Sequence, residues 1–374
     1  MPLSKDTLSL LAPDGSVVQG EAHDRYWHVI DALDEQTLQL MYSTMAITRA
    51  LDYEAGTLQR QGQMALWVPA IGQEACQVGS ALASKPQDSI FPAYREHSVA
   101  RLRGVSMLQI IRMLRGVTHG GWDPETHNNF RLYTLVIGSH TLHATGYAMG
   151  ISLDGDVATG DPSRDEATMV YFGDGATSQG DTHEAMVFAQ SYQAPVLFFL
   201  QNNHWAISTP VRVQSRTPLF HRAAGYGLPS KQIDGNDVLI SYAVTQQMLD
   251  DARSGAGPQF IEALTYRIGA HTTSDDPTKY RDDDELAFWT ARDPIARFRA
   301  YLEGKGTPGS FFTEVDQQAA DEVSDLRKDV LALEPPPSTN IFAHVYSGEH
   351  KPLEAQAAWL EEFEGSFVQK GDGQ

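Results

Sequence analysis

The sequence predicts an α/β protein in which a parallel β-sheet is flanked by helices. Apolar segments at residues 168–172, 195–200 and 260–268 predict strands. Segments with helical character, at 181–192 and 236–252, separate these strands. Continuously apolar strands that alternate with helices are typical of parallel sheets buried on both faces.

The first part of the chain adds further elements to this pattern. We expect residues 1–34 to form an irregular N-terminal arm, with a Pro-Asp-Gly turn at 13–15. Residues 35–60 predict a long helix, because apolar residues recur on one of its sides. Shorter elements are expected at 72–83 (helix), 89–91 (strand) and 104–115 (helix).

The second part of the chain becomes more polar after the last predicted strand. Asn236 is expected to cap the helix that it begins. Beyond residue 283 we expect helices, interrupted by three prolines at 335–337 and followed by a C-terminal helix at 353–363. These patterns divide the chain into an N-terminal arm, an α/β domain and a helical C-terminal extension, at 1–34, 35–303 and 304–374.

Composition excludes some classes of protein. The net charge of −20 argues against a nucleic-acid-binding surface, which needs a basic stripe. No apolar run approaches the ~20 residues that cross a bilayer, so we expect no membrane association. Cys76 is the only cysteine, which makes an intramolecular disulfide impossible. With no signal peptide recognised at the start, a reducing cytoplasm is the expected location.

Polar side chains follow two of the predicted strands, at the point where each strand ends. Asp174 lies in the sequence Gly-Asp-Gly after the first strand, and Asn203 follows the second. The carboxyl ends of parallel strands open onto one crevice, so these side chains are expected to converge. Carboxylate and amide oxygens suit Mg²⁺, and the glycines allow a diphosphate to approach the backbone. The pattern therefore predicts a magnesium–diphosphate site.

Other motifs are excluded by single residues. A dinucleotide fingerprint would need glycine at position 178, where the sequence has Ser178. A phosphate-binding loop needs Gly-Lys-Ser or Gly-Lys-Thr, and neither tripeptide occurs. His183 and Glu184 begin like a zinc-protease helix, but Val187 replaces the second histidine.

The chain around these residues resembles the α subunits of thiamine-diphosphate-dependent 2-oxo acid dehydrogenases, most of all branched-chain members. The resemblance extends from about residue 35 to about residue 303. It rests on matching segments in the right order, at 59–62, 71–75, 94–96, 173–181, 201–208 and 266–276. It implies a thiamine-diphosphate-binding fold, with extensions at both ends, and the cofactors thiamine diphosphate and Mg²⁺.

The resemblance also implies a role for individual residues. Asp174, the side chain of Asn203 and the carbonyl group of Trp205 would bind Mg²⁺. Tyr94, Arg95 and His271 would contact the diphosphate of the cofactor. Gly175 and Ala176 would lie beside the cofactor, as part of the glycine-containing loop. The backbones of Ser139 and Thr141 would contact its aminopyrimidine ring. The family often has a larger aliphatic residue at position 141, glutamate at 174 in some members and arginine at 201. Arg267 would support the loop that carries His271.

His271 is the expected catalytic residue. A histidine can hold the diphosphate and donate a proton or hydrogen bond to the reacting groups near neutral pH. The resemblance implies that the cofactor carries out the decarboxylation. It further implies a β subunit that completes the site in an α₂β₂ heterotetramer, and a lipoyl-bearing acyltransferase that accepts the acyl group.

Oxidative decarboxylation of a branched-chain 2-oxo acid, such as 3-methyl-2-oxobutanoate, is the expected function. Pyruvate and acetoin dehydrogenases are the enzyme alternatives, and a scaffold subunit without cofactor is the non-enzyme alternative. For single residues the competing interpretations are ordinary ones: a turn carboxylate for Asp174, a surface arginine for Arg95 and a loop histidine for His271. We expect His140 and His204 to line the site, and Leu66, Trp67 and Tyr94 to be candidates for the wall of an acyl pocket, while His143 and His183 serve packing or lie on the surface.

Overall fold

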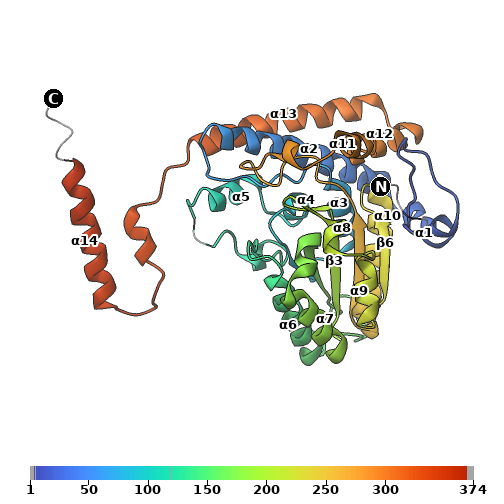
Figure 1. The fold of residues 1–374 in the computed structure, drawn as a ribbon, viewed down its shortest axis with the longest axis horizontal. Coiled ribbons are helices and arrows are strands. Elements are labelled where there is room, and N and C mark those ends of the chain that lie inside the picture. The colour runs from blue at the N-terminus through green and yellow to red at the C-terminus, as the bar shows by residue number, and fades with distance from the viewer. Residues whose placement is uncertain (1–3, 5, 119, 369–374) are drawn as a thin grey trace.

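The core of the protein is a five-stranded parallel sheet (Figure 1). The computed structural model describes residues 4, 6–118 and 120–368. The strands follow the spatial order β1 (Ser89–Phe91), β2 (Thr168–Gly173), β3 (Val196–Asn202), β7 (Gln259–Leu264) and β6 (Ser230–Asp234). Because β2 and β3 are neighbours, with Gly173 opposite Gln201, the residues that follow them emerge side by side.

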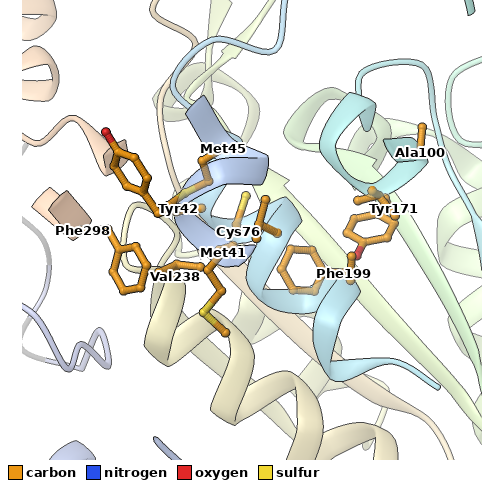
Figure 2. Close-up of a cluster of buried hydrophobic side chains, with 14 of the residues drawn as sticks. Met41, Tyr42, Met45, Cys76, Ala100, Tyr171, Phe199, Val238 and Phe298 are labelled. Carbon is orange, nitrogen blue, oxygen red and sulfur yellow. The ribbon is translucent and has the colours of Figure 1, made fainter. Parts of the chain in front are cut away.

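Alternate side chains of the central strands enter two separate hydrophobic clusters. Tyr171 and Phe199 point to a cluster that includes helices α2 (Glu35–Arg60), α3 (Glu74–Ala83) and α10 (Val238–Asp251). Figure 2 shows both rings in this cluster, together with Cys76 of α3. This burial on one face, matched by burial on the other, explains why the strand sequences are apolar throughout.

The opposite face of the sheet is covered by α6 (Ser139–Asp154), α7 (Gly180–Tyr192) and α9 (Phe220–Gly225). Phe172 and Phe198 pack there against small residues of these helices. Further helices lie around this three-layer core: α1 (Glu21–Asp31), α4 (His97–Leu102), α5 (Met107–Leu114), α8 (Val211–Gln214), α11 (Asp283–Thr290), α12 (Pro294–Gly304) and α13 (Gly309–Leu331). The last helix of the described chain is α14 (Lys351–Val368).

Both ends of the chain contribute to the structure in different ways. In the N-terminal segment Leu8 pairs in parallel with Ile233 of the edge strand β6. Helix α13 packs on α2, with Phe312 and Val330 in the main cluster. Helix α14, by contrast, stands apart from the body in Figure 1. Within the described residues no helix is both long and apolar enough to span a membrane.

Several expected elements have the predicted bounds, and others need correction. The long helix and the first strand coincide with α2 and β1. The N-terminal arm is not irregular throughout, because it contains α1. Asn236 does not cap α10: the side chain of Asp237 accepts hydrogen bonds from the amides of Leu239 and Ile240, at 3.0 and 3.3 Å. Helix α6 and strand β6 were not predicted.

Candidate active site

A cavity of about 230 Å³ opens where the central strands end. It is walled by residues from six separated parts of the chain, which the sheet topology brings together. Its lining consists of Gln73, Ala93, Tyr94, Arg95, Glu96, Ile137, Gly138, His140, Phe172, Gly173, Asp174, Gly175, Ala176, Gln179, Gln201, Asn203, Trp205, Ala206, Ile207 and His271.

The three residues predicted to bind a metal ion all line this cavity. Asp174 begins the short 3₁₀ helix Asp174–Ser178 directly after β2. Asn203 follows β3, and Trp205 begins the small hairpin formed by Trp205–Ala206 and Thr209–Pro210. The crossover helix α7 lies between the two strand ends in the sequence, so only the parallel sheet brings these donors together.

Asp174 is a buried carboxylate without an ion pair among the described residues. Asp174 is 2% exposed, and this burial raises the pKa of its carboxyl group to about 6. Oδ2 accepts a hydrogen bond of 2.9 Å from Nε2 of Gln214, while Oδ1 accepts none from another described residue. A buried charge needs a partner, so this oxygen is suited to a cation from outside the chain.

Asn203 presents its amide oxygen beside the same cavity. Oδ1 accepts a hydrogen bond from the amide of Trp205 at 3.3 Å, and Nδ2 donates to Oε1 of Gln73 at 3.3 Å. Close packing of the metal-binding segments continues at Gly175, where an added Cβ would lie 3.0 Å from Cβ of Ala206. The glycine therefore lets the hairpin approach the loop after β2.

Two buried arginines meet at His271 on the wall of the cavity. Nη2 of Arg95 donates to the carbonyl oxygen of His271 at 3.1 Å and lies 3.3 Å from its Nδ1. Nη1 of Arg267 lies 3.0 Å from the same nitrogen. Neither arginine forms an ion pair with a carboxylate in the described part of the chain. Arg95 lines the cavity, whereas Arg267 is not a lining residue. A guanidinium group beside a cavity without a carboxylate partner is what an anion such as a diphosphate requires.

The contacts of His271 determine where its proton lies. A guanidinium group only donates hydrogen bonds, so Nδ1 must accept and the neutral ring carries its proton on Nε2. Burial, together with Arg95 and Arg267, lowers the pKa of His271 to about 4. Its backbone is also held, because its amide donates to Oδ2 of Asp275 at 2.8 Å. The ring is therefore a neutral Nε2–H donor at neutral pH.

Two of the lining residues, Glu96 and Gln201, belong to a chain of buried hydrogen bonds. Nε2 of Gln201 donates to Oε1 of Glu96 at 2.5 Å, and Nε2 of Gln77 donates to Oε1 of Gln201 at 3.0 Å. Burial raises the pKa of the Glu96 carboxyl. The glutamine at position 201 therefore has structural partners, Glu96 and Gln77. Glu96 was not singled out from the sequence, although it directly follows Tyr94 and Arg95.

Two predicted contacts of the aminopyrimidine ring do not line the cavity themselves. Ser139 and Thr141 lie in the first turn of α6, where their hydroxyl groups donate to the carbonyl oxygens of Val136 and Gly138 at 2.9 and 2.6 Å. Their neighbours Ile137, Gly138 and His140 line it instead. A backbone contact to the cofactor at Ser139 and Thr141 stays a prediction.

Some of the other aromatic and histidine candidates line the cavity, and others lie in the core. His140 lines the cavity and bonds through Nε2 to the carbonyl oxygen of Tyr171 at 2.7 Å. His204, Leu66 and Trp67 are not among the lining residues. Trp67 is a core residue: its indole donates to Asp52 at 2.6 Å and stacks on His97. His183 is a packing residue, with partners at Tyr226 and Thr177.

The donors of the cavity fit a divalent cation that is bound to a diphosphate. Mg²⁺ takes few protein ligands and keeps water or phosphate oxygens, which matches one carboxylate and one amide. Among the described residues no cluster of three acidic, histidine or cysteine side chains forms a complete protein cage. The carbonyl oxygen of Trp205 already accepts a hydrogen bond of 3.3 Å from Nη1 of Arg267, so this ligand would share its oxygen.

Comparison with known proteins shows the family to which the chain belongs. The family described as "Dehydrogenase E1 component" matches residues 42–332. The α subunit of 3-methyl-2-oxobutanoate dehydrogenase from Mycobacterium tuberculosis is 40% identical over 363 residues, which cover 96% of this chain and 95% of that protein. The α subunit of the pyruvate dehydrogenase E1 component from Acholeplasma laidlawii is 37% identical over 332 residues, with 87% and 92% coverage. Its counterpart from Staphylococcus epidermidis is 38% identical over 303 residues, with 80% and 78% coverage.

Proposed function

The chain belongs to the dehydrogenase E1 component family, as an α subunit of a thiamine-diphosphate-dependent 2-oxo acid dehydrogenase, and we propose that it acts on a branched-chain 2-oxo acid such as 3-methyl-2-oxobutanoate. We further propose that Mg²⁺ links the cofactor to Asp174, Asn203 and Trp205. The observation that carries the proposal is the convergence of these three residues with Arg95 and His271 on one cavity.

The charges of the cavity support binding of a metal diphosphate. Arg95 and Arg267 supply positive charge where no carboxylate of the described residues pairs with them. Asp174 supplies a buried negative charge that is suited to the cation. Opposite charges on the wall of one cavity, at Asp174 and Arg95, would bind the two halves of a metal–diphosphate unit together and would also fix its orientation.

The reaction divides between the cofactor and the protein. When bound, thiamine diphosphate supplies the carbon nucleophile and accepts the electrons released as carbon dioxide leaves. His271 holds a proton on Nε2 and can donate it as a hydrogen bond to an anionic oxygen at the cavity. Arg267 and Arg95 keep that ring neutral and fix its orientation, because both donate toward Nδ1. Closure of the site by a partner chain would exclude water from the reacting groups.

Exposed apolar side chains at the cavity support the idea that a second chain completes the site. Ile137 and Ile207 line it, yet they are 39% and 53% exposed. Apolar side chains at the mouth of a site are expected to be covered in the functional assembly. We propose that a β subunit covers them in an α₂β₂ heterotetramer and supplies the remaining cofactor contacts. A lipoyl-bearing acyltransferase would then accept the acyl group.

The branched-chain substrate is supported by the relative that covers almost the whole chain, the 3-methyl-2-oxobutanoate dehydrogenase α subunit. Pyruvate is the second candidate, because pyruvate dehydrogenase α subunits are nearly as similar. The two substrates differ by apolar carbons, and each methylene changes affinity by only ~1–3 kcal/mol.

The substrate is tested by decarboxylation assays on the complex with its β subunit. The comparison uses 3-methyl-2-oxobutanoate, pyruvate and acetoin at matched concentrations, and kcat/KM is measured for each. We expect the highest kcat/KM with 3-methyl-2-oxobutanoate. A preference for pyruvate or acetoin would contradict the branched-chain assignment but leave the cofactor site intact. Failure of the assembled complex to bind thiamine diphosphate and Mg²⁺ would instead favour a scaffold subunit.

A further inference from the structure

Two glutamines contact the side chains that are proposed to hold Mg²⁺, one glutamine for each ligand. Gln214 contacts Asp174, and Gln73 contacts Asn203. They come from different parts of the chain, since Gln214 ends α8 and Gln73 precedes α3. Neither belongs to the predicted set of ligands.

Gln214 occupies one of the two carboxylate oxygens of Asp174. Its Nε2 donates to Oδ2 at 2.9 Å. Its Oε1 accepts from the hydroxyl group of Ser178 at 3.4 Å, so the amide nitrogen faces the carboxylate. Oδ1 of Asp174, which lines the cavity, accepts no hydrogen bond from another described residue. A carboxylate fixed in this way cannot rotate freely to offer either oxygen.

Gln214 is itself held to the loop that carries Asp174. Arg222 of α9 donates through Nη2 to the carbonyl oxygen of Gln214 at 3.1 Å. Through Nη1 it donates to the carbonyl oxygen and the hydroxyl group of Thr177, at 2.7 and 2.9 Å. One guanidinium group thus ties α8 to the 3₁₀ turn that begins at Asp174.

Gln73 determines which end of the Asn203 amide faces the cavity. Its Oε1 accepts from Nδ2 of Asn203 at 3.3 Å, which turns the amide nitrogen toward α3. Nε2 of Gln73 is buried and has no partner in the described structure, so only its acceptor is used. With the nitrogen engaged, Oδ1 of Asn203 is the atom that would bind a cation, although it also accepts a hydrogen bond of 3.3 Å from the amide of Trp205.

We propose that Gln214 and Gln73 are positioning residues that orient Asp174 and Asn203 for a divalent cation, each by engaging the atom of the ligand that does not face the metal. This inference rests on the proposed metal site. Mg²⁺ requires near-octahedral geometry at about 2.0–2.1 Å, so a rotated carboxylate or a flipped amide would cost affinity. Partners of metal ligands typically contribute about 10- to 100-fold in metal affinity.

The test measures the Mg²⁺ concentration at which the α₂β₂ complex binds thiamine diphosphate. Calorimetric titrations at a series of Mg²⁺ concentrations give the midpoint for the wild type, Gln214→Met and Gln73→Met. We expect both methionine variants to need about 10- to 100-fold more Mg²⁺. At saturating Mg²⁺ their affinity for thiamine diphosphate should return to that of the wild type. Gln247→Met, on α10 and away from the cavity, is the matched control and should keep the wild-type midpoint.

A second variant separates hydrogen bonding from packing at position 73. Gln73→Glu keeps an oxygen that accepts from Nδ2 of Asn203, so we expect its Mg²⁺ midpoint to be no higher than that of the wild type. If it behaves like Gln73→Met, the acceptor is not what matters and the inference is wrong for Gln73.

The remaining outcomes distinguish this inference from the proposed function. A wild-type midpoint in either methionine variant would overturn the positioning role of that glutamine. A binding defect that persists at saturating Mg²⁺ would also overturn it, because it would indicate a general structural role. If wild-type binding does not depend on Mg²⁺ at all, the proposed metal site itself fails, and this is read from the wild-type titration alone.

Discussion

Nη1 of Arg267 lies 3.0 Å from Nδ1 of His271. This contact, together with that from Arg95, makes Nδ1 an acceptor and leaves the ring proton on Nε2. It also opposes a second proton, since the imidazolium charge would lie beside two guanidinium groups. The fold of the ligand-free protein therefore already keeps the His271 ring neutral, with its proton on Nε2.

The first prediction concerns the titration of His271. Its pKa falls from 6.5 to about 4 because of burial and the two arginines. The folded protein then binds fewer protons at this ring than the unfolded chain, so its contribution to stability is present above pH 6.5 and is lost as the pH falls toward 4. In ¹H–¹⁵N spectra of the ligand-free protein we expect an Nε2–H ring throughout pH 6–8. A titration midpoint near 6.5 would contradict the geometry.

The second prediction concerns the charge of Arg95. Arg95→Met removes a buried donor from the predicted diphosphate contacts, and a hydrogen bond to a charged group contributes about 1.5–3 kcal/mol. We expect the dissociation constant for thiamine diphosphate to rise about 10- to 100-fold in calorimetric titrations of the complex. Arg101→Met is the control, because Arg101 pairs with Glu322 outside the cavity. Equal affinity in both variants would remove Arg95 from the site.

The third prediction concerns a trade-off between stability and binding at Asp174. Burial raises its pKa from 3.8 to about 6, so the folded protein binds more protons there than the unfolded chain. Ionisation of Asp174 then lowers stability as the pH rises through this range. Without Mg²⁺, Asp174→Asn should gain up to about 3 kcal/mol in the free energy of unfolding at pH 7. Urea denaturation at pH 4 and pH 7 measures this gain.

The same experiment carries its own control. The advantage of Asp174→Asn should be small at pH 4, where the wild-type carboxyl is already protonated. An advantage of equal size at both pH values would show that packing, and not the charge, is responsible. A loss of stability at pH 7 would contradict the idea that the buried carboxylate lacks a partner in the ligand-free chain.

The fourth prediction concerns the close packing of α3 on α10. A Cβ at Gly79 would lie 2.5 Å from the carbonyl oxygen of Val238 and 2.8 Å from Cβ of Ser241. Gly79→Ala must separate these helices, and overpacking costs about 1–3 kcal/mol. Gly146→Ala on α6 meets nothing within 4 Å and should instead gain up to about 1 kcal/mol. Urea unfolding of both variants tests the contrast, which equal stabilities would contradict.

Much of the fold could be predicted because its strongest signals are local. The apolar strands β2 and β3 are buried on both faces, so their sequences carry few other residues. Strand β6 escaped prediction because an edge strand with the sequence Ser-Lys-Gln-Ile-Asp has no apolar run. At the start of α10, Asn236 and Asp237 are both good capping residues. The choice of Asp237 depends on tertiary contacts, because its carboxylate also accepts from the amides of Leu10 and Leu11.

The site was predictable where its residues directly follow a recognisable strand. Asp174 and Asn203 directly follow strands, and the rule for parallel sheets brings them to one cavity. Gln214 lies outside the matching segments, and Gln73 lies in one of them, at 71–75, without a role that the resemblance assigns. The proposed role of each glutamine arises from a single contact with a residue far away in the sequence. Trp67 was expected as a candidate for the pocket wall because it is an aromatic residue near a motif. In the structure it is a core residue, and its indole donates a hydrogen bond to Asp52.

The most direct test of the account is calorimetric titration of the α₂β₂ complex with thiamine diphosphate, with and without Mg²⁺, for the wild type and Asp174→Ala. We predict tight binding by the wild type only when Mg²⁺ is present. We predict that Asp174→Ala loses this Mg²⁺-dependent binding while the complex stays assembled. Tight binding that persists in Asp174→Ala, with the same response to Mg²⁺, would contradict the assignment of this cavity.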